Sequence, residues 1–257
     1  MKHAVYALLV AFVPAVASAG SAEKRGFEIA RDLDRANEGF HGEQWHLEMI
    51  LVNAQGDKTT RELQGKVKET EGDGDKSIMT FASPADVRGT KLLTWTHKKG
   101  DDDQWLFMPS MRRTRRISAH NRSGSFMGSE FTYEDFNSQE LEAYRYKFLR
   151  DTRVKGRPVW VLEQVPIKHK SGYSRMECWY DQEYMNPLQI KYYDRKGKLL
   201  KVALFKDYKR YRGSYWRSNR VIMTNKQTGK KTIMIWSKRR LGKSAPDGDF
   251  SKERLDE

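Results

Sequence analysis

Cysteine is almost absent from this chain of 257 residues. Cys178 is the only one, so no disulfide can form within the chain. It lies in the alternating run MECWY at residues 176–180, which favours a packed strand position, and no neighbour in the sequence would activate its thiol. We therefore expect Cys178 to be buried and chemically inert.

Motifs for catalysis and metal binding are also missing. The histidines beyond the first 19 residues are scattered and form no HExxH pair. They are His41, His46, His97, His120 and His169. There is no phosphate-binding loop or dinucleotide fingerprint, and the serine in residues 124–128 stands one place too early for a nucleophile elbow. Because no active-site role can be filled, we predict no catalytic residue, metal or cofactor, and no enzymatic activity.

Two acidic turns in the sequence could bind calcium weakly. Residues 72–75 read GDGD and residues 101–103 read DDD, and neither has the spacing of an EF-hand. We interpret both as solvated hairpin turns.

The apolar run near the N-terminus, residues 4–16, is shorter than the roughly 20 residues that a membrane-spanning helix needs. Lys2 precedes it, and a small-x-small pattern follows at residues 17–19. This arrangement predicts a secretory signal peptide, residues 1–19, cleaved after Ala19, with an uncleaved membrane anchor as the alternative. Residues 20–257 would then form a single domain with a sizeable core.

The charge of the chain is strongly positive. Without Lys2, the 48 basic residues become 47, and 47 minus 34 acidic residues leaves +13. Such a charge favours anionic partners, and secretion makes nucleic acid an unsuitable one. An anionic lipid or an acidic protein surface remains, although the charge also suits solubility alone.

Hydrophobic periodicity predicts one helix followed by many strands. Residues 24–37 have helical spacing and end near Gly39, and from Gly42 onward apolar and polar residues alternate in short runs. Short strands at regular spacing indicate an antiparallel meander that closes into a barrel or half-barrel. The expected strands include residues 45–51, 63–67, 77–82, 92–97, 104–108, 115–118, 144–151, 158–165, 173–181, 188–194, 199–208, 215–224 and 231–238. Residues 137–143 and 251–255 are expected as short helices.

Several strands are apolar on both faces, for example residues 202–205 and 233–236. A sheet with one wet face would alternate cleanly, so helices, loops or an apolar ligand must cover both faces.

Residues 105–136, WLFMPSMRRTRRISAHNRSGSFMGSEFTYEDF, combine apolar side chains with a dense positive cluster. Four arginines occupy five positions: Arg112, Arg113, Arg115 and Arg116. They suit a phosphate, the anionic part of a lipoprotein or an acidic partner surface, and a solvated hairpin is the alternative. The flanking side chains are candidates for an apolar ligand cavity, although rings of this kind also build ordinary cores. These candidates are Trp105, Phe107, Met108, Phe126, Met127, Phe131, Tyr133 and Phe136.

Segments in order along nearly the whole chain resemble the LolA-like family of periplasmic outer-membrane lipoprotein-sorting proteins. The most specific is SGSFMGSEFTYEDF at residues 123–136, and SPADVRGT at 83–90 and DQWLFMP at 103–109 accompany it. The resemblance implies a mainly β (α+β) fold: a half-open antiparallel β-barrel with an N-terminal helix and short helices covering its concave face. It also implies a location in the periplasm.

The chain resembles a divergent branch of that family, and the resemblance implies a carrier. Such a carrier would hold the acyl chains of a lipoprotein or another lipid in an apolar cavity and pass them between membranes, with transient contact to a membrane surface and no nucleic acid. Some members of the branch accompany inner-membrane transporters of the resistance-nodulation-division (RND) type. The alternative is therefore a non-carrier accessory subunit that docks on such a transporter through the basic patch. A lipid hydrolase is a third reading, for which no catalytic residue stands out.

Overall fold

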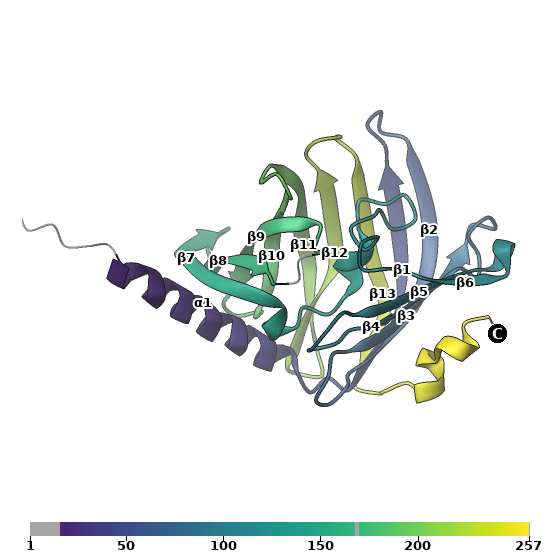
Figure 1. Cartoon of the computed structure of the whole chain (residues 1–257), viewed down its shortest axis with the longest axis horizontal. Helices are drawn as coiled ribbons and strands as arrows, with labels where there is room; N and C mark the ends of the chain where they lie inside the picture. Colours follow the sequence, from purple (N-terminus) through teal and green to yellow (C-terminus); the bar gives the residue numbers. More distant parts are fainter. Residues whose placement is uncertain (1–15, 168–169, 257) are drawn as a thin grey trace, which may run out of the picture.

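The computed structural model describes residues 16–167 and 170–256. A long helix, α1 (Val16–Asn37), precedes one antiparallel sheet of thirteen strands, which stays open rather than closing into a barrel (Figure 1). The strands are β1 (Gly42–Val52), β2 (Lys58–Lys68), β3 (Lys76–Ser83), β4 (Lys91–Trp95), β5 (Asp103–Met108), β6 (Arg113–Arg116), β7 (Tyr144–Val154), β8 (Arg157–Pro166), β9 (Tyr173–Asp181), β10 (Asn186–Asp194), β11 (Leu199–Tyr211), β12 (Tyr215–Asn225) and β13 (Lys231–Leu241). Short 3₁₀ helices are η1 (Pro109–Met111), η2 (Tyr133–Phe136), η3 (Leu141–Ala143), η4 (Asp247–Phe250) and η5 (Lys252–Arg254).

The sheet is built from two meanders. Strands β1 to β6 pair in sequence, strands β7 to β13 pair in sequence, and β13 pairs with β1 to join the halves. This order leaves β6 and β7 at the two free edges. The chain between them, residues 117–143, therefore has to cross from one edge to the other, and it does so over the concave face. We call residues 117–143 the inner segment.

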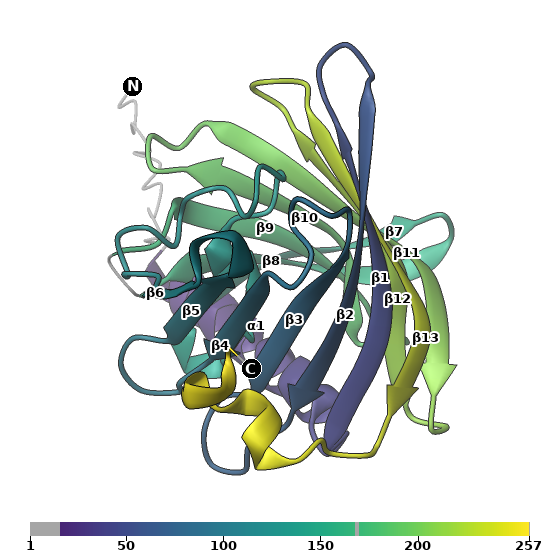
Figure 2. The same ribbon diagram turned by 90° about the vertical axis from the view of Figure 1, so that its right-hand side faces the viewer.

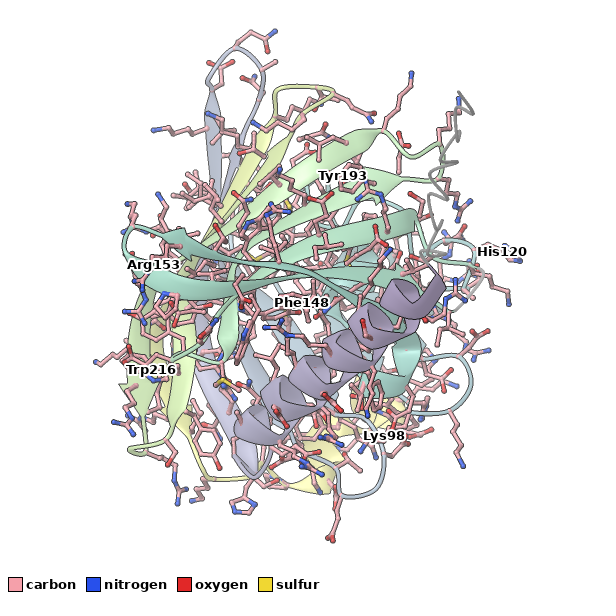
Figure 3. The ribbon with its side chains drawn as sticks, turned by 90° about the vertical axis from the view of Figure 1, so that its left-hand side faces the viewer. Lys98, His120, Phe148, Arg153, Tyr193 and Trp216 are labelled. Atoms are coloured by element: carbon pink, nitrogen blue, oxygen red, sulfur yellow. The ribbon has the colours of Figure 1, made fainter. Side chains whose placement is uncertain are left out.

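Helix α1 covers the concave face beside β7. Its buried residues Ile29, Ala30 and Leu33 pack into the main core, and the helix crosses the front of the molecule beside Phe148 (Figure 3). A Cβ atom at Gly26 would stand 2.6 Å from the backbone nitrogen of Phe148, so only glycine permits this close approach. The Arg25 guanidinium lies 3.7 Å from the centroid of the Phe148 ring.

Both faces of the sheet carry an apolar core, as the two-faced strands predicted. On β4, Leu92 belongs to the concave core and its neighbour Leu93 to a second cluster on the opposite face. In that outer cluster, Ala245, Phe250 and Leu255 of the C-terminal segment cover the side chains of β4 and β5. Figure 2 shows this segment lying over β3 and β4, with α1 on the far side of the sheet.

The predicted mainly β, half-open fold is confirmed, with local differences. Of the short helix expected at residues 137–143, only η3 forms. The expected short helix at residues 251–255 is the 3₁₀ helix η5, and with η4 it covers the outer face rather than the concave one because Phe250 and Leu255 fill the outer cluster. The predicted helix at residues 24–37 begins earlier, at Val16, so it runs through the expected cleavage site. Most of the expected signal peptide, residues 1–15, lies outside the described residues. Within the described parts of the chain, no helix is both long and apolar enough to cross a membrane.

Candidate functional site

The inner segment fills the concavity of the sheet with aromatic side chains. Phe126 is fully buried, and its ring centroid lies 5.8 Å from that of Phe81 on β3. The ring centroids of Tyr133 and Phe136 lie 5.6 Å and 4.7 Å from that of Phe126, both in edge-on arrangements. Edge-on aromatic pairs of this kind add to the stability gained from burial alone, so the segment is a packed part of the core.

A buried ion pair fastens the middle of the inner segment to β11. Lys201 Nζ donates to Asp135 Oδ2 over 2.5 Å, and the two side chains are only 2% and 5% exposed. Lys201 also donates to the backbone oxygen of Glu130 at 3.0 Å, while the Tyr173 hydroxyl donates to Asp135 Oδ1 at 2.7 Å. A charge pair so far from water requires such extra hydrogen bonds. Removing one partner would leave the other as an uncompensated buried charge.

The start and the end of the inner segment are held by one carboxylate. Arg122 Nη1 donates to Asp102 Oδ2 over 3.0 Å, and Asn137 Nδ2 donates to the same oxygen over 2.8 Å. Asp102 is 6% exposed. The expectation of a fully solvated turn at residues 101–103 is therefore wrong for Asp102, because a buried arginine twenty positions along the chain neutralises it.

The predicted apolar candidates fall on both faces of the sheet. Trp105 and Phe107 belong to the outer cluster beneath the C-terminal segment. The other six lie on the concave side, either in its core or packed against it: Met108, Phe126, Met127, Phe131, Tyr133 and Phe136. None of the eight lines the large cavity described below.

The four predicted arginines are exposed at the β5–β6 hairpin, on a free edge of the sheet. Directly paired residues share a face, so Arg113 and Arg115, opposite Met108 and Leu106, belong to the concave side. Arg116 lies opposite Trp105 on the outer side and forms an ion pair with Asp103.

The hairpin also brings one arginine close to the apolar candidates. Burial raises the pKa of the Tyr133 hydroxyl, and the positive charge of Arg115 opposes that rise. Arg112 takes a left-handed backbone conformation, φ 45°, at the turn. The cluster is thus divided between the two faces rather than gathered into one pocket.

A cavity of about 960 Å³ opens between the C-terminal half of α1 and the sheet. Its apolar wall includes Leu33 on the helix, Tyr146 on β7 and Tyr180 on β9. Further lining residues include Ala30, Asp34, Phe40, Glu43, Glu69, Asp73, Asp75, Lys98, Glu140, Leu141, Gln164, Met185 and Arg217. Sequence reasoning missed this cavity because its walls come from many segments far apart in the chain.

Carboxylates outnumber cations in the lining. Eight acidic residues line the cavity against two lysine or arginine residues, Lys98 and Arg217. The eight are Asp34, Glu38, Glu43, Glu69, Glu71, Asp73, Asp75 and Glu140. Lys98 lies below α1 in Figure 3.

Several of these carboxylates are already compensated within the protein. Glu43 accepts ion pairs from Arg239 at 3.0 Å and Arg217 at 3.6 Å. Asp73 Oδ2 lies 2.8 Å from His97 Nδ1, and this hydrogen bond lowers the pKa of Asp73 to about 2.

Three others lie in a less favourable environment. Burial, with the negative charge of Glu69, raises the pKa of Asp75 to about 6. Burial, with the charge of Asp75, raises the pKa of Glu140 to about 7, and burial also raises the pKa of Asp34. The expected solvated turn at residues 72–75 is therefore wrong for Asp75, which lines the cavity.

Cys178 is fully buried, as predicted, and burial raises the pKa of its thiol. In the described ranges, residues 16–167 and 170–256, no group of three or more His, Cys, Asp or Glu side chains is arranged to hold a metal ion.

Several solved protein structures are similar to this chain in fold and, in part, in sequence. A domain from Vibrio parahaemolyticus, assigned as an outer-membrane lipoprotein-sorting protein, is 44% identical over 91% of this chain and all of its own, with a TM-score of 0.89. A DUF1329 family protein from Desulfovibrio piger is 28% identical over 91% of this chain and 99% of its own, with a TM-score of 0.86. A LolA superfamily protein from Nitrosomonas europaea shares the fold at 22% identity, over 88% of this chain and 97% of its own, with a TM-score of 0.70. A family model described as "Uncharacterized protein" matches residues 73–257, and no protein with a curated description matches the chain.

Proposed function

Since the chain belongs to a divergent branch of the LolA-like family of outer-membrane lipoprotein-sorting proteins, we propose that it is a periplasmic carrier. It binds the acyl chains of a lipoprotein or another lipid in an apolar cavity and passes them between membranes. Residues 20–257 act as one carrier domain after removal of a signal peptide at Ala19. The carrier works by binding alone and needs no catalytic residue, cofactor or metal.

The observation that carries the proposal is the cavity between α1 and the concave face. Its volume of about 960 Å³ lies within the range of about 300–1,000 Å³ that ligand pockets occupy. Leu33, Tyr146 and Met185 give it an apolar wall that continues into the concave core. Burying an acyl chain contributes about 0.8 kcal/mol per methylene, so a chain of twelve carbons contributes on the order of 10 kcal/mol without covalent attachment.

The inner segment contributes Glu140 and Leu141 to the wall of the cavity. The apolar core behind that wall includes Phe126, Phe131, Met108 and Met127, and the methionines help it adapt to cargo chains of different shape because methionine is flexible and polarizable. Tyr133 and Phe136 belong to the same core. Trp105 and Phe107 support it from the outer cluster.

A fluorescent fatty acid tests this proposal with a matched pair of variants on α1. Ala30 lines the cavity, whereas Ala36, six residues further along the same helix, is exposed and does not line it. Ala30→Trp should reduce uptake of the fatty acid about tenfold or more by filling the cavity, whereas Ala36→Trp should leave uptake unchanged. Wild-type protein that neither takes up the fatty acid nor co-purifies with lipid would contradict the carrier function.

A second candidate function, the accessory subunit of an inner-membrane RND-type transporter, is favoured by two basic surfaces. The β5–β6 hairpin presents its four arginines beside Met111, which is 59% exposed. On the outer face, a groove of about 640 Å³ is lined by Lys66, Lys91, Lys238 and Arg240 among others. Both surfaces suit an acidic partner or the transient approach of an anionic membrane.

Charge reversal separates the two candidates. Glutamate at all four hairpin positions, Arg112, Arg113, Arg115 and Arg116, should abolish capture of an inner-membrane partner if the hairpin is a docking surface. The accessory subunit would be favoured if the four-glutamate variant loses partner capture but still takes up the fatty acid. It would be favoured further if Ala30→Trp leaves the partner-dependent function unchanged.

A further inference from the structure

The large cavity has the opposite charge balance to the chain around it. The chain carries 48 basic and 34 acidic residues, yet the cavity lining has eight acidic residues and only two lysine or arginine residues. A cavity meant only for an uncharged chain would gain nothing from desolvated carboxylates, and an anionic head group beside them would weaken the binding of an acyl chain without preventing it. The lining therefore indicates a cargo with a positive charge.

Three carboxylates remain available to such a charge. Asp34 on α1 and Glu140 on the inner segment make no side-chain hydrogen bond or salt bridge to the described residues, and Asp75 accepts a hydrogen bond only from the backbone of Thr70. The two cationic residues of the lining, Arg217 and Lys98, do not neutralise these three carboxylates. Arg217 Nη1 donates to Asn37 Oδ1 at 2.7 Å and its Nε lies 3.6 Å from Glu43, whereas Lys98 acts on the trio only at longer range.

An uncharged side chain in the same cavity lacks its partner as well. Gln164 on β8 is 3% exposed and lines the cavity. Its amide nitrogen donates to the Tyr180 hydroxyl at 2.7 Å, but its Oε1 atom accepts no hydrogen bond within the described chain. A buried acceptor without a donor is costly, and an N–H group of a ligand would satisfy it.

Another part of the cavity wall is apolar and aromatic. Leu33, Phe40 and Tyr146 lie among the lining residues, so an apolar chain and a positive group can be accommodated side by side. Aromatic faces also attract organic cations.

From this juxtaposition of Asp34, Asp75 and Glu140 with the unpartnered Gln164 oxygen and an apolar wall, we propose that the cavity recognises an ammonium group attached to an apolar chain. This inference rests on the proposed carrier function and specifies its cargo as a cationic amphiphile. The ammonium group binds among the three carboxylates and donates to Gln164 Oε1, while the chain lies along α1.

Three amphiphiles of equal chain length test the charge preference on the full-length mature protein: dodecylamine, dodecanol and dodecanoate, each below its micelle concentration. Calorimetry at pH 8 should give the tightest binding for dodecylamine, roughly tenfold or more tighter than dodecanol, and the weakest for dodecanoate. The triple variant Asp34→Asn, Asp75→Asn and Glu140→Gln should lose that advantage and keep its affinity for dodecanol.

Asp32→Asn is the matched control, because Asp32 is an exposed carboxylate on the same helix that does not line the cavity. It should change none of the three affinities. Melting temperatures of the variants check folding, and the triple variant should be no less stable than wild type because its buried charges have been removed.

The outcomes separate the two proposals. Binding of dodecanol and dodecylamine with equal affinity would overturn the ammonium site and leave the carrier function standing, whereas binding of neither would overturn the carrier function itself. Two further probes identify the source of the ammonium group, lysophosphatidylethanolamine for a lipid headgroup and N-dodecanoyl-lysine amide for a lysine-bearing lipopeptide. A loss of affinity for either probe in the triple variant supports the site, and unchanged affinity for both contradicts it.

Discussion

Replacing Lys201 by methionine should destabilise the protein by about 3–5 kcal/mol, because the substitution leaves the Asp135 carboxylate buried without its cation. Asp135 would keep hydrogen bonds from the Thr132 backbone and the Tyr173 hydroxyl, both at 2.7 Å, which soften the loss without neutralising the charge. At about 2–4 °C per kcal/mol for a chain of this size, the melting temperature should fall by roughly 6–20 °C.

The double variant Lys201→Met, Asp135→Asn makes this prediction specific to the ion pair. Removing both charges should cost less than the sum of the two single changes, with a coupling of about 1–3 kcal/mol in urea denaturation. Urea curves of wild type, the two single variants and the double variant give all four free energies of unfolding. If Lys201→Met stays within about 1 kcal/mol of wild type and the changes are additive, the ion pair does not anchor the inner segment.

Three other substitutions or probes test separate features. Burial raises the pKa of Asp75 to about 6 in the folded state, so its contribution to stability is present below its unfolded pKa near 4 and is lost as the pH rises through 6. Asp75→Asn should therefore raise the free energy of unfolding by about 1–3 kcal/mol at pH 8 and by almost nothing at pH 3.5, and an equal gain at both pH values would contradict the raised pKa. Gly26→Ala should lower stability by about 1–3 kcal/mol, since the new Cβ meets the Phe148 nitrogen at 2.6 Å, and an unchanged melting temperature would show that α1 does not need this contact. The Cys178 thiol, fully buried and with its pKa raised by burial, should react with a thiol reagent only after unfolding, so rapid labelling of the native protein would contradict its burial.

Local patterns in the sequence were sufficient to predict the elements of the sheet. Alternating side chains mark both faces of each strand, so runs such as residues 173–181 were predicted with the bounds that β9 has. The apolar residues on both faces also correctly indicated two cores, for which Leu92 and Leu93 on β4 are an example.

The path of the inner segment depends on a long-range pairing that no local pattern reveals. Only the pairing of β13 with β1 places β6 and β7 at opposite edges and requires residues 117–143 to cross the concave face. The role of Asp102 escaped prediction for the same reason. Its partner Arg122 lies in a loop, and a run of three aspartates looks like a solvated turn until that contact is known.

The acidic cavity was the largest feature that the sequence did not indicate. Asp34, Asp75, Glu140 and Gln164 belong to four different segments, and each alone resembles an ordinary surface or core position. The four arginines within residues 112–116 indicated instead a binding surface at the β5–β6 hairpin. The resemblance to a known family supplied the fold and the carrier hypothesis, but not the site.

The carrier function can be tested by native mass spectrometry of the mature protein purified from a periplasmic extract, followed by identification of any bound lipid. We expect a bound acyl species that carries an ammonium group, and we expect the Ala30→Trp variant to lose it and the Ala36→Trp variant to keep it. Wild-type protein that appears only at its own mass, and stays so after incubation with acyl lipids, would contradict the claim that this protein is a carrier.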